Sequence, residues 1–324
     1  MPEYSEDPDL TGSRGFQSLR EGFYKAVFFT FAAATVLTTI AIILTLLVDA
    51  VSFFSAYSPI AFLTGLDWSP ALRPVSFGVL PLVFGTLTVT ATAAVIAIPV
   101  GTLTAVYLSE YAAARTRSVL KPLLEILAGV PTVIYGFFAL VYVTPAIDVL
   151  FPSVGTFNVL SASLMVGIMT IPMVSSISED AMSAVPDSLR QAGYGMGATK
   201  YEVTTDIVVP AATSGIVSSY ILAISRAIGE TMIVTVAMGM QPSLPVVRTA
   251  EVFGFGIPFV HPGEVFLTSG QTMTAAMVQI ANSDLAGGTL AYKSLFAIGL
   301  TLFVITLLMN IVSNIVSERY REEY

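Results

Sequence analysis

Long apolar runs dominate the chain and are separated by shorter polar segments. A helix that crosses a bilayer needs about 20 mostly apolar residues, because each residue rises about 1.5 Å through a hydrocarbon core about 30 Å thick. Five runs meet this requirement directly, and a sixth meets it only with Arg226 and Glu230 inside it. The pattern therefore predicts an all-α polytopic membrane protein with six transmembrane helices. The predicted spans are residues 24–48, 78–108, 120–147, 158–177, 209–239 and 290–316.

Composition supports a membrane protein and excludes several kinds of chemistry. Hydrophobic residues make up 55% of the 324 residues and charged residues only 11%, and the mean hydropathy is +0.81. Soluble domains carry about a quarter charged residues, so this chain has too few to cover a water-exposed surface. The sequence has no cysteine and one histidine, His261, which excludes thiolate and multi-histidine metal sites. It also has no G-x-x-x-x-G-K-[ST] phosphate loop, so ATP would have to be hydrolysed on another chain.

The distribution of basic residues predicts the orientation. With the N-terminus inside, ten of the 14 lysines and arginines lie on the cytoplasmic side, three lie outside, and Arg226 lies in the membrane. Cytoplasmic loops normally carry this excess, so both termini of a multi-pass cell-membrane protein are expected in the cytoplasm. The first span is longer than the apolar part of a cleaved signal and is expected to remain as an anchor.

The spans and loops divide the chain into four predicted parts. The third part contains an interior loop and a long exterior loop, and Thr272–Asn282 in the exterior loop is predicted to be a short external or partly embedded helix. The parts are an acidic tail at 1–23, a first span with an exterior loop at 24–77, a transmembrane domain at 78–316 (interior loop 179–210, exterior loop 240–289) and a tail at 317–324.

The interior loop has the sequence of two helices joined by a tight turn. Pro186 suits the first turn of a helix, and Gly197 suits a left-handed position at a helix end. A first helix is expected at about Asp187–Met196, and Thr199 with Glu202 has the spacing of a capping box that begins a second helix. The loop is therefore predicted to form a rigid knob in the cytoplasm. An ordinary surface hairpin without a partner is the alternative.

Arg226 and Glu230 are four residues apart, so they are predicted to share one face of one helix. A charge at mid-bilayer costs about 2.5–3.5 kcal/mol on insertion scales, and such residues normally face a bundle interior or a water-filled path. One interpretation is an ion pair that only fixes helix packing. The other is an oxyanion route, because the forked donors of a guanidinium match phosphate oxygens. Glu230 could then accept a hydrogen bond from the P–OH group of phosphate, a group that fully ionised sulfate or molybdate lacks.

The interior loop resembles the cytoplasmic signature of ABC importer permeases. Residues Gln191–Thr199 read QAGYGMGAT, and Pro210 follows 13 residues after Gly197. The family pattern is Glu-Ala-Ala, three residues, Gly and a later Pro; here Gln191 replaces the Glu and Gly193 replaces the second Ala. The resemblance implies a coupling helix that docks in a cleft of a separate ATPase. The positions it assigns to this contact are Gln191, Ala192, Gly193, Gly197, Ala198, Thr199 and Pro210.

Three further segments resemble the PstC-type permeases of the phosphate-specific ABC importers. They are Arg226–Met232 (RAIGETM), Leu127–Gly136 (LAGVPTVIYG) and Leu295–Leu300 (LFAIGL). With the interior loop, the likeness extends over about residues 75–318. It implies the type I ABC importer permease fold and a role as half of the transmembrane path for inorganic phosphate.

The same resemblance implies partners and functional residues. The partners are a second, PstA-like permease, a homodimeric PstB-like ATPase and an extracytoplasmic PstS-like phosphate-binding protein, besides membrane lipid; no nucleic acid is expected. Arg226 and Glu230 match residues that the family associates with transport. ATP and Mg²⁺ would be bound by the ATPase, so no cofactor, metal or catalytic residue is expected on this chain.

Two other transport functions remain open at this point. A permease for sulfate, molybdate or phosphonate would share the interior loop, and only the charged pair and the segment Gly229–Met232 (GETM) argue against it. An ion-coupled secondary transporter would work without an ATPase, but such proteins commonly have paired repeats and more buried ionisable residues. An intramembrane enzyme is disfavoured, because the sequence shows no nucleophile–base constellation or metal-ligand cluster.

Overall fold

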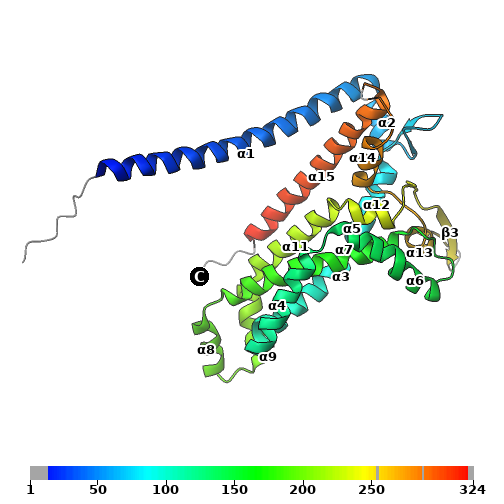
Figure 1. Cartoon of the computed structure of the whole chain (residues 1–324). Coiled ribbons are helices and arrows are strands. Elements are labelled where there is room, and N and C mark those ends of the chain that lie inside the picture. The colour runs from blue at the N-terminus through cyan, green and yellow to red at the C-terminus, as the bar shows by residue number, and fades with distance from the viewer. Residues whose placement is uncertain (1–13, 253–254, 287, 320–324) are drawn as a thin grey trace, which may run out of the picture. The chain divides into compact units, whose positions relative to one another are not determined.

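The structure is a computed structural model that describes residues 14–252, 255–286 and 288–319, and these are mostly helical (Figure 1). The elements are α1 Arg14–Ala56, α2 Pro59–Thr64, β1 Trp68–Ser69, β2 Ser76–Phe77, α3 Leu80–Val106, the π-helical turn η1 Tyr107–Tyr111, α4 Ala114–Gly129, α5 Thr132–Phe138, the π-helical turn η2 Ala139–Val143, α6 Thr144–Leu150, α7 Val159–Ser183, α8 Asp187–Gly195, α9 Lys200–Glu202, the π-helical turn η3 Val203–Val208, α10 Val209–Ala211, α11 Thr213–Ile228, α12 Met232–Ala237, β3 Val247–Val252, β4 Phe255–Val260, α13 Pro262–Phe266, α14 Met273–Ala281 and α15 Leu290–Arg319.

The chain divides into two compact units, residues 1–49 and 50–324. The described part of the first unit is the greater part of α1, which contains the span predicted at 24–48. Several of its large apolar side chains are exposed, and Phe28, Phe31 and Leu37 are about two-thirds exposed or more. A helix that leaves such side chains unpacked within its own unit has the surface expected of a segment surrounded by lipid.

Within the described residues, five helical stretches are long and apolar enough to cross a membrane, and a sixth is bent. The bent one joins Lys200–Ala211 to Thr213–Ile228 at an angle of 69°. The predicted number of six spans therefore holds when this bent pair is counted as one span, but that span ends at Ile228 and not at the predicted residue 239. The five unbent stretches are Arg20–Ala56, Leu80–Tyr111, Thr132–Leu150, Val159–Ser183 and Leu290–Val312.

The third span is not the continuous helix predicted at 120–147. α4 ends at Gly129, Val130 is extended, and α5 begins after Pro131. Proline disfavours helical geometry in the residue before it, which accounts for the interruption at Val130. The span is formed by α5, η2 and α6, and α4 is a separate helix with the charged residues Arg117 and Lys121 on it.

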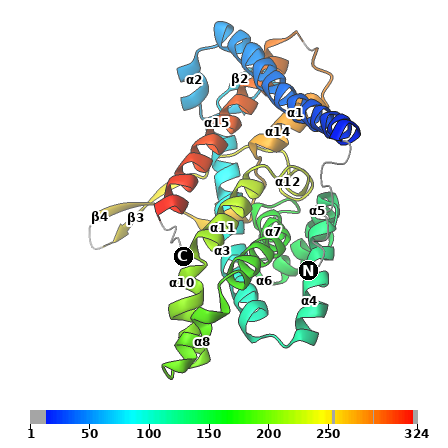
Figure 2. The ribbon, with the colours of Figure 1, turned by 90° about the vertical axis from the view of Figure 1, so that its left-hand side faces the viewer.

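The core of the second unit lies where α3, α7 and α11 pack side by side (Figure 2). Small residues allow the close approach of α3 and α7: a Cβ added to Gly101 would lie 2.6 Å from the Cβ of Val174. A second core joins the end of α1 and α2 to α14 and α15, and its aromatic rings include Phe53 and Phe77 with centroids 5.4 Å apart. These two cores fix α3 along much of its length.

The exterior loop 240–289 contains both a confirmed and an unpredicted element. The helix expected at Thr272–Asn282 is α14, with Thr272 as its N-cap and Asn282 as its C-cap. α14 is embedded rather than peripheral, because it packs on α3, α12 and α15. The antiparallel hairpin β3–β4, which pairs Val247 with Val260, was not predicted, and neither was the short pair β1–β2.

Candidate functional site

The interior loop folds into the predicted helix–turn–helix. α8 begins after Pro186, and the turn that follows it has Gly197 at φ +88°. The Gly197 N–H donates to the Tyr194 carbonyl at 3.0 Å, and the Ala198 N–H donates to the Gly193 carbonyl at 3.1 Å. These bonds satisfy carbonyls at the end of α8, and the positive φ is one that a residue with a Cβ adopts only with strain.

The predicted capping box is present at the start of α9. The Thr199 hydroxyl accepts the Glu202 N–H at 3.3 Å, and the Glu202 carboxylate accepts the Thr199 N–H at 2.7 Å. Two hydrogen bonds hold the pKa of Glu202 below its usual range: the larger effect comes from the Thr199 N–H and the smaller one from the Thr199 hydroxyl. The cap therefore uses the ionised carboxylate to fix the second half of the knob.

The knob exposes most of the predicted coupling residues and buries one. A Cβ on Gly193 would lie 2.6 Å from Cδ1 of Ile207 and 2.9 Å from Cγ2 of Val203, so Gly193 lets α8 lie against η3. The tip also exposes Met196, at 82%, and Tyr201, which the sequence analysis did not select. Gln191, Ala192, Gly197, Thr199 and Pro210 are exposed, and Ala198 is half-buried.

Glu230 lies in a break between two helices, so the prediction that Arg226 and Glu230 share one face of one helix is wrong. α11 ends at Ile228, and α12 begins at Met232. One carboxylate oxygen of Glu230, which is 6% exposed, accepts the N–H groups of Met232 at 3.0 Å and Ile233 at 3.2 Å. The carboxylate thus satisfies two N–H groups at the start of α12 that have no partner within that helix. Gly229 also weakens the helix, because only proline has a lower helix propensity than glycine.

Arg226 stands at the end of α11, just before this break. Its guanidinium lies 3.7 Å from the Met169 sulfur on α7. In the described part of the chain it forms no salt bridge with Glu230 or with any other carboxylate. The guanidinium, on a residue that is exposed overall, is therefore available to an anion from outside the chain.

Residues 97–322 match the family described as binding-protein-dependent transport system inner membrane component. The chain belongs to this family. It is 31% identical over 313 residues to the probable ABC transporter permease protein YqgH of Bacillus subtilis, covering 96% of this chain and 95% of that protein. It is also 31% identical over 268 residues to the phosphate transport system permease protein PstC of Mesorhizobium japonicum, covering 77% and 75% respectively.

Two solved structures share the fold of the permease at low sequence identity. One is a bacterial ABC transporter involved in the import of the acidic polysaccharide alginate, with a TM-score of 0.62, 12% identity, and coverage of 96% of this chain and 100% of the other. The other is the MetNI methionine ABC transporter, with a TM-score of 0.53, 16% identity, and coverage of 76% and 95%. The predicted ABC importer permease fold is confirmed, and the permease is a multi-pass membrane protein.

Arg190 anchors the knob of the permease through contacts that no sequence pattern indicated. Its guanidinium donates to the Met182 carbonyl at 2.8 Å and to the Val185 carbonyl at 2.5 Å, both at the end of α7. It also pairs with the Glu110 carboxylate on η1 at 3.0 Å. The side chains of Glu110 and Arg190 are only 5% and 15% exposed. The residue just before Gln191 thus ties α8 to both α3 and α7.

A second buried charge of the permease links α4 to α7. Glu179, 1% exposed, pairs with Arg117 and with Lys121, whose Nζ lies 2.7 Å from Oε2. Lys121 also reaches Asp180 at 3.0 Å. The hydrogen bond from Lys121 to Glu179 is the largest cause that raises the pKa of Lys121. These partners are about 60 residues apart in the chain, so no local spacing could have identified them.

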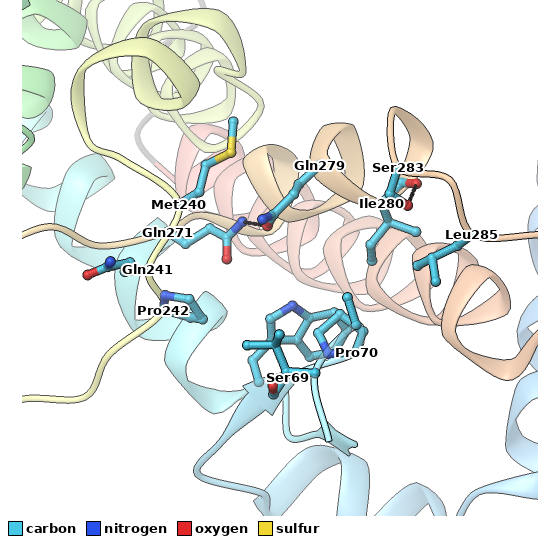
Figure 3. A pocket seen from close by; sticks show the side chains of 13 residues that line it. Ser69, Pro70, Met240, Gln241, Pro242, Gln271, Gln279, Ile280, Ser283 and Leu285 are labelled. Atoms are coloured by element: carbon cyan, nitrogen blue, oxygen red, sulfur yellow. Dashed lines mark hydrogen bonds between the residues drawn. The ribbon is translucent and has the colours of Figure 1, made fainter. Parts of the chain in front are cut away.

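A cavity of about 380 Å³ lies between β1 and α14 (Figure 3). Within the second unit, α14 lies at the opposite end from α8 (Figure 1). Gln271 and Gln279 join there through a hydrogen bond of 2.7 Å. The side chains that line the cavity are all uncharged, so it has no formal charge with which to attract an anion. Arg226 is a better candidate for the anion contact of the permease than this cavity.

Proposed function

We propose that this permease forms one half of the transmembrane path through which an ATP-driven importer moves inorganic phosphate into the cell. Its likeness to PstC permeases over more than three-quarters of the chain supports phosphate as the substrate. A second, PstA-like permease would supply the other half of the path. A homodimeric PstB-like ATPase would bind ATP and Mg²⁺, and a PstS-like binding protein would deliver phosphate from outside.

The observation that carries the proposal is the Arg226 guanidinium at the helix break, which has no carboxylate partner in the described part of the chain. A guanidinium stays protonated at any physiological pH and presents forked N–H donors that fit two phosphate oxygens. An arginine already paired within its own chain would have to break that pair before it could bind an anion. Arg226 is therefore our proposed anion contact.

Glu230 is proposed to have two roles beside Arg226. Its carboxylate fixes the start of α12 through the Met232 and Ile233 N–H groups. Because an ionised carboxylate has about four acceptor positions, two bonds to backbone leave capacity for the P–OH of a phosphate. Sulfate and molybdate lack that proton near neutral pH, so Glu230 would favour phosphate over them.

The knob would transmit the state of the ATPase to this path. Gln191, Ala192, Gly197 and Thr199 are exposed on it and are our proposed ATPase contacts, with Ala198, Gly193 and Pro210 shaping their support. ATP binding would close the ATPase dimer and turn the path outward, and hydrolysis would return it inward. This arrangement would place both termini in the cytoplasm, which the excess of basic residues in the predicted interior loops supports.

The test is phosphate uptake by proteoliposomes that contain the assembled importer, with ATP inside and phosphate-loaded binding protein outside. Arg226→Lys keeps the charge but loses the forked donors, and uptake is expected to fall about tenfold, equivalent to about 1.4 kcal/mol. Arg115→Lys, an exposed arginine on α4, is the matched control and should leave uptake unchanged. Unchanged uptake by Arg226→Lys would contradict the anion contact.

Two further arms of this experiment address the alternative substrates and mechanism. Competition by sulfate, molybdate and phosphonate against labelled phosphate separates a phosphate path from a general oxyanion path. Omission of the ATPase should abolish uptake completely. Uptake that continued without it would favour an ion-coupled secondary transporter instead.

A further inference from the structure

The π-helical end of α3 is held by both helices of the knob. Glu110 on η1 pairs with Arg190 of α8 at 3.0 Å. The next residue, Tyr111, has the Lys200 ammonium of α9 5.0 Å from the centre of its ring. Two independent contacts from neighbouring residues of η1 therefore reach the two halves of the knob, α8 and α9.

The contact between α8 and η1 is difficult to break. Glu110 is 5% exposed, and Arg190 bonds at once to its carboxylate and to the carbonyls of Met182 and Val185. Separating the pair would leave a buried charge without a partner, which is strongly destabilising. A displacement of α8 is therefore expected to carry the end of α3 with it.

Near its opposite end, α3 contacts residues 271–274 at the start of α14, and this segment in turn bonds to Glu230 in the break between α11 and α12. The buried Thr86 hydroxyl accepts the Met273 N–H at the start of α14, at 3.0 Å. A Cβ on Gly85 would lie 2.2 Å from the Gln271 carbonyl, so α3 and this segment are in direct backbone contact. The Thr274 hydroxyl in turn donates to the Glu230 carbonyl at 2.7 Å.

We propose that α3 and η1 act as one transmission element that carries movement of the knob to the break between α11 and α12, with Glu110 and Arg190 as positioning residues at its driven end. α3 has 27 residues, which at about 1.5 Å each gives about 40 Å, enough to cross the membrane. At one end Glu110 bonds to Arg190 of the knob, and near the other end Thr86 bonds to Met273, which is followed by the Thr274 that bonds to Glu230. The inference rests on the proposed function, since it needs an ATPase to move the knob.

The test uses a reporter at the break. The natural chain has no cysteine, so Met232→Cys introduces a single thiol on a residue that is 41% exposed, at the start of α12. The full importer is assembled, and maleimide labelling of this thiol is timed with and without ATP and vanadate. The reporter alone should change its labelling rate when nucleotide is trapped. Glu110→Gln and Arg190→Lys are expected to abolish that change.

The controls separate transmission from folding and docking. Asp180→Asn removes a 64% exposed carboxylate that pairs with Lys121, and it should leave the nucleotide response intact. Co-purification of the ATPase should be retained in Glu110→Gln and Arg190→Lys, and both variants should stay folded at the assay temperature, although loss of the buried pair is expected to lower the melting temperature. Loss of the ATPase or of the folded state together with the response would assign the pair to docking or folding and overturn the proposal.

Two results bear directly on α3 as the transmitting element. A normal nucleotide response in both Glu110→Gln and Arg190→Lys would refute it, as would a reporter that never responds in the unsubstituted background. Arg226→Lys in the same assay should keep the nucleotide response and lose only phosphate uptake. Failure of the anion contact would thus appear in uptake alone, and failure of transmission would appear in the labelling rate.

Discussion

Gly197 offers the sharpest test of the knob, because its effect can be separated from packing. A Cβ added at Gly197 meets no atom within 4 Å, and the same holds for Gly195 two residues earlier. Only Gly197 has a positive φ, at +88°, whereas Gly195 is the last residue of α8. The two alanine substitutions therefore add the same methyl group to open space and differ in backbone conformation.

The expected difference follows from the conformational cost. A residue with a Cβ in left-handed geometry costs about 1–2 kcal/mol, so Gly197→Ala should destabilise the turn by that amount. Alanine at position 195 is compatible with the helical backbone there. Gly195→Ala should therefore stabilise the folded knob by about 0.4–1 kcal/mol, because alanine has less conformational freedom than glycine in the unfolded chain. The opening equilibrium of the turn should shift by about 5- to 30-fold toward opening in Gly197→Ala.

Hydrogen exchange measures this equilibrium directly. The reporting amides are those of Gly197 and Ala198, which donate to the carbonyls of Tyr194 and Gly193 in the closed turn. Peptides that cover residues 187–208 of the assembled importer should lose protection in Gly197→Ala and keep it in Gly195→Ala. Equal protection in the two variants would show that the positive φ is not what stabilises the knob. The affinity for the ATPase should fall in parallel.

Two further predictions concern the charged residues near the knob. Glu179→Gln removes a buried carboxylate that accepts hydrogen bonds from two cations, and this loss should lower the free energy of unfolding by about 1–3 kcal/mol. The loss should be seen as a lower melting temperature. A drop no larger than that of the exposed control Asp180→Asn would contradict the buried network. Glu202 has a depressed pKa, so its cap is fully formed above the usual pKa of 4.5 and is lost as pH falls through the lower, folded-state value. The affinity for the ATPase should therefore not change through titration of this cap near neutral pH. At that pH Glu202→Ala should bind the ATPase more weakly than the unsubstituted chain. Glu202→Gln should bind nearly as well as the unsubstituted chain, because its amide oxygen still accepts the Thr199 N–H.

The knob could be predicted from the sequence because each of its signals acts over a few residues. Pro186, Gly197 and the pair Thr199–Glu202 specify a helix start, a turn and a cap through the nearest neighbours in the chain. The structure forms all three. The apolar spans were predictable for a similar reason, since length and hydropathy are local properties of a segment.

The break at Glu230 was predictable only in part. Gly229 weakens a helix, but its propensity alone gives no reason to end one inside a membrane, where unpaired backbone groups are costly. The helix can end there because the Glu230 carboxylate accepts two N–H groups of α12 and Thr274, 44 residues later, bonds to the Glu230 carbonyl. Such distant partners leave no spacing pattern, and the same is true of Glu110 with Arg190.

The break also explains how a carboxylate could lie beside the anion contact that we propose at Arg226. On a continuous helix, Glu230 would have paired with Arg226 and neutralised the one cation that this span contributes. In the broken helix the charge of Glu230 is directed to the N–H groups of Met232 and Ile233, and the Arg226 guanidinium remains without a partner among the described carboxylates. Hydrogen bonds from these two amides also offset part of the negative charge that an approaching anion would meet. The interruption between α11 and α12 is therefore what makes Arg226 and Glu230 compatible as neighbours, and a change that restored a continuous helix there should remove the proposed anion contact without altering either residue.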